Sequence, residues 1–472
     1  MRRIPQQKGR VMEATDLTRR NFLKGAGAAL AAVGAAGIAG CTSESSAAEA
    51  SASASASASA SASASASEAA TEEAAKALDP VIPEFPPVVE PTYSSAAVKV
   101  GDVTWDNEAD VVVVGCGTAG TAAAIEVADA GFTPLIIEKH DWPGGQLRRC
   151  GGGVAAAGSQ VQAKFGIDDN PEDFYEYWMR SCENLANPDI VREYTMNSAQ
   201  VIDWLIDDLG GQPLDEWELV GDNDGLEYSH DPGLNVGTEF MFEEVGMERV
   251  PRCHWFTKNA DDPFCTDPTK LTYPTSGGTG LWKTIGAALE ERNIETLLET
   301  PIKSLVVAED SNEVLGVCCL HEGKDYYIKA RKGVMMAMGN WASNHEMFSN
   351  FTGNDYVPGG GGGIGLDLED DNDGAGIKAG LAIGADIVFP SLVGHNHDTP
   401  DGASFGCGGF RVDTKMHVID IFGQAIPRLF AGGAAAGGVI VKNYPVCGAS
   451  VGRGLYFGRV AGQELAKLDA WQ

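Results

Sequence analysis

The residues whose types and spacing suggest chemistry are three glycines in a turn, Gly115, Gly117 and Gly120, and an acid further along, Glu138. Gly115 permits a tight turn, Gly117 lets the backbone approach a pyrophosphate, and Gly120 lets a helix pack closely on a strand. The amino end of that helix favours phosphate charge, and Glu138 follows at the spacing of a carboxylate that binds a ribose. The pattern predicts a dinucleotide site for a flavin or a nicotinamide.

Regular elements must hold this turn in place. Residues 111–114 are consecutive valines, typical of a strand that is buried on both faces of a parallel sheet, and 135–137 is a second apolar run that ends at Glu138. Strand, turn, helix, strand and acid in this order indicate a βαβ unit, whereas a glycine-rich turn without a ligand is the alternative. We therefore predict an α/β fold with a Rossmann-like domain on a parallel sheet.

The rest of the chain alternates helical and strand-like segments. An acidic region at 170–209 is helix-like, residues 273–278 are expected to open a helix that runs through Glu291, and a last helix is expected at about 448–468. Strand-like runs predict a small β-meander, at 302–307, 314–320 and 326–330, which ends at 333–339.

The composition is strongly acidic. The chain has 34 lysines and arginines against 66 aspartates and glutamates, which gives a formal net charge of −32. This balance disfavours nucleic acid and anionic lipid surfaces as partners, whereas a basic partner is compatible with it.

The amino terminus is predicted to be an export signal. The segment TRRNFLK at 18–24 matches the twin-arginine consensus, and 25–40 is an apolar stretch too short to span a bilayer. Residues 38–41 resemble a lipobox in which Cys41 would carry a lipid, and a soluble exported form is the alternative. After it, Ser-Ala alternation and a Pro-rich stretch cannot form a core, so folded sequence is expected from about Val98. The mature protein is expected outside the cytoplasm or in the periplasm.

Seven blocks occur in one order over residues 108–468: IIEKHDWPGG, SGGTGLWKTI, KGVMMAMGNWASN, GIGLDL, GGFRVDTKMHVI, IPRLFAGGAAAGG and FGRVAGQELAKL. Their order resembles the fumarate reductase and flavocytochrome c superfamily of flavoproteins, which includes the ketosteroid dehydrogenases. The resemblance implies FAD, bound without a covalent link because Gly145 stands where respiratory relatives carry the histidine that holds flavin. The turn and the resemblance together assign these residues to FAD: Gly115, Gly117, Thr118, Ala119, Gly120, Glu138, Lys139, Gly144, Gly145, Gly152, Gly153, Gly339, Asn340, Gly365, Asp367, Gly433, Ser450 and Val451.

The composition of the chain and the resemblance together indicate a division of the chain. We expect a twin-arginine signal at 1–40, a linker at 41–97, and an FAD-binding domain in two parts, 98–214 and 273–472. Between those parts lies an acidic, aromatic-rich insertion at 215–272, which could form a lid that excludes water from the substrate. A surface decoration and an oligomer contact are the alternatives for this insertion.

The residues that bind the substrate in fumarate reductases are replaced by other residue types in this sequence. Phe405 stands where those enzymes carry a histidine, the arginine segment reads KNYPVCG at 442–448, and 387–408 is too short for their capping domain. Two carboxylates left unpaired in a dry site would lose several kcal/mol. Fumarate is therefore disfavoured as the substrate.

The segment YPVCGASVGRGLYFGRVAG from Tyr444 is instead similar to the ketosteroid dehydrogenase pattern YxGPGxxxGPxxxFGxxAG. In that family a tyrosine hydroxyl and a glycine N–H bind a ketone oxygen, which implies those roles for Tyr444 and Gly448. Two such donors stabilise an enolate, and each can contribute ~3 kcal/mol. A turn tyrosine without a substrate role is the alternative. Further candidates for proton transfer are Tyr273, His395 and Arg453.

The ten cysteines show no CxxC, CxxCH or ferredoxin spacing, so no haem c and no metal ligand set are predicted from spacing. Cys253 and Cys265 could pair outside the cytoplasm. The resemblance keeps open an iron-sulfur cluster with scattered ligands. Electrons are therefore expected from an external donor, such as a membrane-associated or exported cytochrome.

Taken with the resemblance, these residues predict an exported FAD-dependent reductase. It would reduce a C=C bond conjugated to a carbonyl, in an enone, enoate or lactone, by hydride transfer from flavin N5. A ketosteroid-type dehydrogenase in the oxidative direction and a flavin electron-transfer subunit are the alternatives. An NAD dehydrogenase is disfavoured because only the GxGxxG motif at 115–120 follows a predicted strand and opens a helix.

Overall fold

The computed structural model describes residues 96–213, 234–235, 245–265, 277–352, 372–394 and 404–471. The chain divides into two compact units, Met1–Val88 and Val89–Gln472, and all described residues belong to the second. The predicted signal, nearly all of the linker and much of the insertion lie outside the described residues. So do four of the predicted site residues, Tyr273, Gly365, Asp367 and His395.

The fold is built on a mainly parallel sheet, which confirms the predicted α/β class. Strand β2 (Asn107–Val114), helix α3 (Thr118–Asp129) and strand β3 (Pro134–Ile137) form the βαβ unit, with Val111 opposite Pro134. Valines 111–114 are at most 2% exposed, because the sheet is covered on both faces at this strand. Three further parallel strands extend the sheet: β10 (Lys324–Met336) beside β2, β14 (Ala425–Ala431) beside β10, and β7 (Glu295–Leu297) beside β3.

Strand β10 belongs to two pairings at once. Its first half lies antiparallel to β9 (Val314–His321), which in turn pairs with β8 (Ile302–Val307). Its second half lies parallel to both β2 and β14. Strand β10 joins the predicted runs at 326–330 and 333–339, and it has a shift in register between Ala330 and Gly333. Gly333 lets β10 lie close to β14, because a Cβ atom at this position would be 2.7 Å from the carbonyl oxygen of Arg428.

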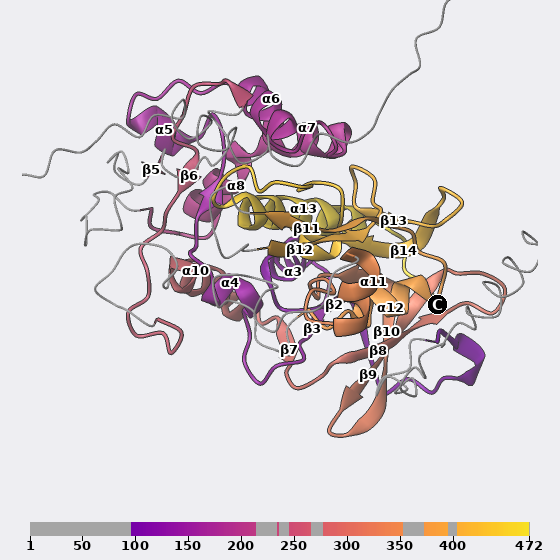
Figure 1. Cartoon of the computed structure of the whole chain (residues 1–472). Coiled ribbons are helices and arrows are strands. Elements are labelled where there is room, and N and C mark those ends of the chain that lie inside the picture. Colours follow the sequence, from indigo (N-terminus) through magenta and orange to yellow (C-terminus); the bar gives the residue numbers. More distant parts are fainter. Residues whose placement is uncertain are drawn as a thin grey trace, which may run out of the picture. The chain divides into compact units, whose positions relative to one another are not determined.

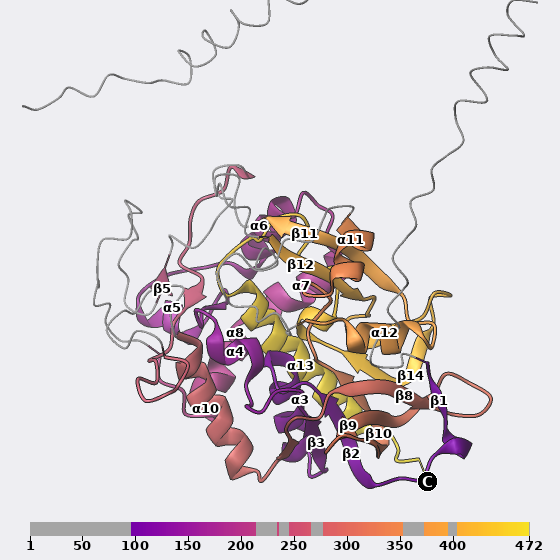
Figure 2. The ribbon, with the colours of Figure 1, turned by 60° about the horizontal axis from the view of Figure 1, so that its bottom comes forward.

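Helix α13 (Ala449–Lys467) lies against α3, as Figure 2 shows at the centre of the view. The helices approach closely because α13 places glycines at the contact. A Cβ at Gly458 would lie 2.4 Å from the Ala119 oxygen, and one at Gly462 would lie 2.6 Å from the Ala123 oxygen. The start of α13 is thereby fixed relative to the glycine turn that precedes α3.

The predicted helical region at 170–209 forms several helices. Asn170 and Asn187 each cap a helix whose first residue is proline, so the region is divided by its own caps. Figure 1 shows α5, α6 and α7 on one side of α13, with β2, β3, β8, β9 and β10 on the other. Helix α5 (Gln160–Lys164) precedes this region, whose helices are α6 (Pro171–Ser181), α7 (Pro188–Asn197), α8 (Ala199–Asp203) and a π-helical turn, η2 (Trp204–Asp208).

Shorter elements complete the described fold. None of the helices within the described ranges is both long and apolar enough to cross a membrane. The remaining helices are η1 (Val100–Asp102), α4 (Gly145–Arg149), α10 (Gly277–Glu291), α11 (His345–Thr352), α12 (Ala375–Leu381) and η4 (Gly433–Ala435). The remaining strands are β1 (Val98–Lys99), β4 (Val154–Ala155), β5 (Leu234–Asn235), β6 (Cys253–His254), β11 (Ile387–Gly394), β12 (Ser404–Phe410) and β13 (His417–Ile419).

Candidate functional site

The three glycines of the turn have three different surroundings. Gly115 has a φ of +101° and donates its N–H to the Ile137 oxygen at 2.8 Å, so it turns the chain at the end of β2. A Cβ at Gly120 would lie 2.0 Å from the Gly115 oxygen, so this glycine lets α3 pack on the turn. A Cβ at Gly117 would meet no atom within 4 Å. The space at Gly117 is therefore left open by the protein itself, as a site for a phosphate group requires.

The amino end of α3 faces this open space. Gly117 is the N-cap of α3 and supplies no side-chain cap to the first-turn N–H groups. Those groups, which begin at Thr118 and Ala119, carry the partial positive charge of the helix start. The geometry fits the diphosphate of a dinucleotide, which would accept these hydrogen bonds.

Glu138 is held directly beneath the turn. Its carboxylate is buried and accepts hydrogen bonds from the N–H groups of Cys116, at 2.9 Å, and His140, at 3.1 Å. A carboxylate has acceptor capacity beyond two bonds, so both oxygens can still accept a ribose hydroxyl. The neighbouring Lys139 forms an ion pair with Asp373 at 3.2 Å. Burial raises the pKa of the Cys116 thiol to about 12, which leaves it a protonated filler of the turn.

A second glycine turn lies against the first. Gly144 and Gly145 have φ values of +109° and +49°, and α4 begins at Gly145. A Cβ at Gly145 would lie 3.4 Å from the Cα of Gly117. The two turns thus border the same space, and Gly145 offers no side chain that could bond to a cofactor.

The segment at 150–153 joins this region to α10. Gly278 donates its N–H to the Cys150 oxygen at 2.9 Å. A Cβ at Gly152 would lie 2.2 Å from the Gly277 carbonyl carbon, and one at Gly153 would lie 2.5 Å from the Cys253 Sγ. The predicted FAD residues Gly152 and Gly153 therefore lie where three segments meet.

Three more of the residues predicted to bind FAD lie just beyond the ends of β10 and β14. Gly339 has a φ of +81°, and Asn340 donates its N–H to the Asn372 side-chain oxygen at 3.0 Å. Gly433 has a φ of +64°, and a Cβ there would lie 3.2 Å from the Ala119 Cβ. Gly433 reaches α3 because parallel strands end at one edge of a sheet, where such folds bind their ligands.

Tyr444 lies over the first turn of α13. Its side chain is 7% exposed, and its hydroxyl accepts a hydrogen bond from the Ser450 N–H at 2.9 Å, one residue before Val451. Burial raises the pKa of Tyr444 well above its usual value, so the hydroxyl stays protonated. A phenol that accepts one bond and keeps its proton is able to donate to a carbonyl oxygen.

Gly448 is the N-cap of α13, next to Tyr444. It has a φ of +84°, and its carbonyl accepts a hydrogen bond from the Ala155 N–H at 3.2 Å. A Cβ at Gly448 would lie 2.6 Å from the Gly153 carbonyl carbon and 2.7 Å from the Ala155 nitrogen. The structure thus brings Tyr444 and Gly448 together with the loop that carries Gly153.

Arg453 lies on α13 but is engaged with the backbone. Its Nη1 donates to the Gly433 oxygen at 3.0 Å and to the Ala436 oxygen at 3.3 Å, and the residue is 6% exposed. These contacts fix the segment after β14, so the placement favours a structural role over proton transfer for Arg453.

The described part of the insertion docks through buried polar contacts that sequence reasoning missed. Strand β6 pairs with β4 and β5, and Arg252 binds Asp169 through two hydrogen bonds, at 2.9 and 2.7 Å. His254 is 2.6 Å from the Ser159 Oγ through Nε2 and 2.9 Å from the Arg252 oxygen through Nδ1. No local sequence signal could reveal these pairs, because their partners are separated by 83 and 95 residues.

The described cysteines are all free thiols. The predicted pairing of Cys253 with Cys265 is therefore not present in the structure, where Cys253 is buried on β6 and Cys265 is partly exposed. In the described part of the chain, His, Cys, Asp and Glu side chains form no group of three that could hold a metal ion.

Comparisons with known proteins agree with this geometry. A family model described as FAD binding domain matches residues 110–388. An NADH:fumarate oxidoreductase of Klebsiella pneumoniae is 28% identical over 254 residues, which cover 53% of this chain and 22% of that protein. A digoxin reductase of Eggerthella lenta is 29% identical over 319 residues, which cover 64% of this chain and 49% of that protein. The chain thus spans less than half the length of these two relatives.

Among solved structures, a 3-ketosteroid-delta4-(5alpha)-dehydrogenase of Rhodococcus jostii in complex with 4-androstene-3,17-dione shares the fold. The TM-score is 0.65 at 24% identity, and the match covers 79% of this chain and 100% of that one. With the family match, the open space at Gly117 and the position of Glu138, the cofactor is FAD. The chain belongs to the FAD binding domain family, within the superfamily of flavoenzymes similar to fumarate reductases and ketosteroid dehydrogenases.

Proposed function

We propose that the protein reduces a C=C bond conjugated to a carbonyl group, in an enone, enoate or lactone. The observation that carries this proposal is the buried, protonated hydroxyl of Tyr444 at the start of α13, next to Gly448. A neutral donor at a helix start suits an uncharged carbonyl oxygen that gains negative charge during the reaction. The digoxin and fumarate reductases among the relatives support reduction as the direction.

When bound, FAD supplies hydride transfer at its N5 position to the β-carbon of the substrate. Tyr444 donates a hydrogen bond to the carbonyl oxygen, and the N–H of Gly448 acts as the second donor. These donors stabilise the enolate that forms when the β-carbon accepts the hydride. A proton delivered to the α-carbon then completes the reduction, and Tyr273 and His395 remain the candidates for its delivery.

The same residues support a second candidate, a ketosteroid-type dehydrogenase that runs in the oxidative direction. The specific observation in its favour is the likeness of fold to the Rhodococcus jostii enzyme, which carries the ketone 4-androstene-3,17-dione. Carbonyl binding by Tyr444 and Gly448 serves both directions, because a transition state is common to the forward and reverse reactions. The direction is then set by the potentials of the substrate and the electron partner.

Further features of the proposal concern the rest of the chain. We propose export by the twin-arginine route, with Cys41 as a lipid anchor, noncovalent FAD, and an exported or membrane-associated cytochrome as electron donor. The insertion at 215–272 acts as a lid. The chain divides after residues 40, 97, 214 and 272 into the signal, the linker and the domain parts.

Replacing Arg19 and Arg20 by lysine should leave FAD-loaded protein in the cytoplasm. Export of that variant would contradict this route.

The direct test is reoxidation of the reduced protein without oxygen. Dithionite-reduced protein should regain its oxidised flavin spectrum when 4-androstene-3,17-dione or another enone, an enoate or a lactone is added. Fumarate is the matched control, because Arg453 is already engaged with backbone carbonyls and offers a dicarboxylate no free counter-charge there. Reoxidation by fumarate and by none of the carbonyl compounds would overturn the proposal.

A further inference from the structure

The inserted segment is joined to helix α4 by a buried ion pair. The Arg148 Nε donates to both carboxylate oxygens of Asp262, at 3.1 and 2.9 Å. The side chain of Asp262 is 2% exposed and that of Arg148 is 14% exposed. A charged pair this well shielded from water is fixed in position, because separating it would leave a buried charge unpaired.

Aromatic rings enclose this ion pair. The Arg148 guanidinium lies 4.9 Å from the ring centre of Phe264 and 5.7 Å from that of Trp282. Phe264 donates its N–H to Asp262 at 3.0 Å, and its ring lies 4.6 Å from that of Trp142. We call Arg148, Asp262 and Phe264 the insertion clasp. Cation–π contacts add to an ion pair when both are withdrawn from water, so the clasp is a cooperative unit.

Arg148 is also bonded to the second glycine turn. Its Nη1 donates to the Pro143 oxygen at 3.3 Å, and its N–H donates to the Gly144 oxygen at 3.4 Å. A Cβ at Gly144 would lie 2.9 Å from the Arg148 Cβ, so the arginine is packed directly on this turn. The next residue, Gly145, borders the open space at Gly117. One side chain therefore contacts both the insertion and the turn that borders the FAD site.

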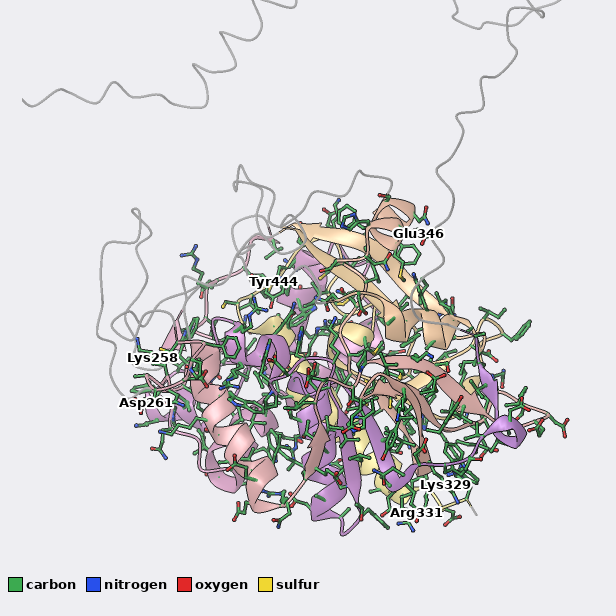
Figure 3. All side chains as sticks on the ribbon, turned by 90° about the horizontal axis from the view of Figure 1, so that it is seen from below. Lys258, Asp261, Lys329, Arg331, Glu346 and Tyr444 are labelled. Atoms are coloured by element: carbon green, nitrogen blue, oxygen red, sulfur yellow. The ribbon has the colours of Figure 1, made fainter. Side chains whose placement is uncertain are left out.

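The insertion has further anchors at the start of α10. Asn259 donates its N–H to the Thr279 hydroxyl at 3.1 Å. A Cβ at Gly280 would lie 2.2 Å from the Thr257 oxygen, so the segment crosses the helix at close range. Figure 3 shows Lys258 and Asp261 beside α10. The segment that carries Asp262 is thus supported on two sides.

We propose that Asp262 is a positioning residue for FAD, acting through Arg148. The insertion clasp holds the turn at 143–145 against Gly117, so that retention of FAD depends on the insertion as well as on the βαβ unit. A turn that is ordered before binding loses less conformational entropy when the cofactor arrives. The proposal goes beyond the proposed function, because it concerns how the cofactor is kept and not which substrate is reduced.

The test is the rate at which the holoprotein releases FAD. Asp262→Asn keeps the size of the side chain and removes its charge, and we expect release to be roughly 10- to 100-fold faster, as for loss of a charge-assisted hydrogen bond. Phe264→Leu should accelerate release by a smaller factor. Release is followed by the rise of flavin fluorescence after dilution, so no substrate is needed and the result is independent of the proposed reaction.

Asp129→Asn is the matched control. It removes another two-bond pair, with Arg292 at 2.6 and 3.1 Å, at the opposite end of α3 from the glycine turn. Its FAD release should equal that of the parent protein. Equal acceleration by this control, or unchanged release from folded Asp262→Asn, would overturn the proposal.

A conservative variant covers the case in which Asp262→Asn fails to fold. Arg148→Lys keeps the charge but loses the planar fork that binds both oxygens of Asp262. We expect the melting temperature of Arg148→Lys to lie within a few degrees of that of the parent protein. We expect this variant to release FAD several-fold faster than the parent. Parent-like release from this variant would contradict the clasp.

Discussion

Helices α3 and α13 both have a glycine at the N-cap, and these two glycines are needed for opposite reasons. At the start of α3, a Cβ on Gly117 would meet no atom within 4 Å, whereas at the start of α13 a Cβ on Gly448 would lie 2.6 Å from the Gly153 carbonyl carbon. The first helix leaves its amino end open for a group that the chain does not supply. The second is packed against the chain, and Tyr444 covers its first turn.

In the proposed function, the start of α3 binds the cofactor and the start of α13 polarises the substrate. An uncovered helix start favours a permanent anion such as a diphosphate. At the start of α13, a first-turn N–H already donates to the neutral Tyr444 phenol. Such a helix start suits a substrate group that becomes negative only during the reaction. Substitutions at the two starts should therefore fail in different ways.

The largest effect is expected at the open start. Gly117→Val should weaken FAD binding by roughly 1000-fold, about 4 kcal/mol, because its methyl groups would occupy the phosphate space. The free energy of unfolding of the apoprotein should change little, since a Cβ there meets no atom within 4 Å. Flavin content and urea unfolding of the apoprotein measure the two quantities. Gly120→Ala is the contrast, because its Cβ would lie 2.0 Å from the Gly115 oxygen and should destabilise the fold itself. Stoichiometric FAD in Gly117→Val would place the phosphates elsewhere.

The next effect is expected at the covered start. Tyr444→Phe should lower kcat by ~100-fold or more, about 3 kcal/mol in the barrier, because it removes a donor to the developing enolate. Substrate affinity should fall less than kcat, and flavin content should not change. Stopped-flow reoxidation with the natural substrate measures the rate, and an artificial dye serves as control because it needs no carbonyl donor. Near-parent activity of Tyr444→Phe would remove Tyr444 from the mechanism.

A smaller effect is expected when the packed glycine is changed. Gly448→Ala should lower the free energy of unfolding by about 2 kcal/mol or more, because alanine disfavours a φ of +84° and its Cβ would approach the Gly153 backbone. Thermal unfolding of the holoprotein measures this change. A variant as stable as the parent would mean that the loop at 153–155 can move to make room for the added Cβ atom. The packing at the start of α13 would then differ less from the open start of α3.

The smallest effect concerns the loop that packs on Gly448. His254 contacts the Val154 oxygen through Nδ1, and burial lowers the pKa of His254 from 6.5 to about 4. The folded state therefore binds fewer protons than the unfolded state between these values, so stability is lost as the pH falls through this window. The histidine should account for about 1 kcal/mol of lost stability between pH 7 and pH 5.5. Urea unfolding at both pH values checks this. In His254→Gln, this part of the loss of stability between pH 7 and pH 5.5 should disappear. If the variant loses as much stability as the parent, other groups cause the pH dependence.

The sequence predicts best what depends on neighbouring residues. The glycine turn, the valine strand and Glu138 lie within one βαβ unit, so their positions follow from local geometry. The start of α13 was likewise predicted within one residue, because a glycine and helical periodicity mark it.

The sequence could not predict contacts that depend on distant parts of the chain. Asp262 and Arg148 are 114 residues apart, and neither stands in a motif. Arg453 is one of the candidates for proton transfer in the sequence, and only the fold reveals that it binds the carbonyls of Gly433 and Ala436. Pairing of Cys253 with Cys265 was plausible from their spacing alone, but Cys253 lies buried on a paired strand. Side-chain partners across a fold are set by tertiary packing, which local patterns do not encode.

The double pairing of β10 has a consequence for how the protein is made. Its antiparallel partner β9 is adjacent in the chain, so this hairpin can form during synthesis, whereas its parallel partner β14 emerges from the ribosome about a hundred residues later. Tyr444 and Gly448 follow β14, so the start of α13 can be complete only after β14 has been synthesised. A secretion route that threads an unfolded chain would send this protein out before it could hold its flavin. A route that accepts folded cargo, as proposed for the twin-arginine segment, lets the cytoplasm load the cofactor first.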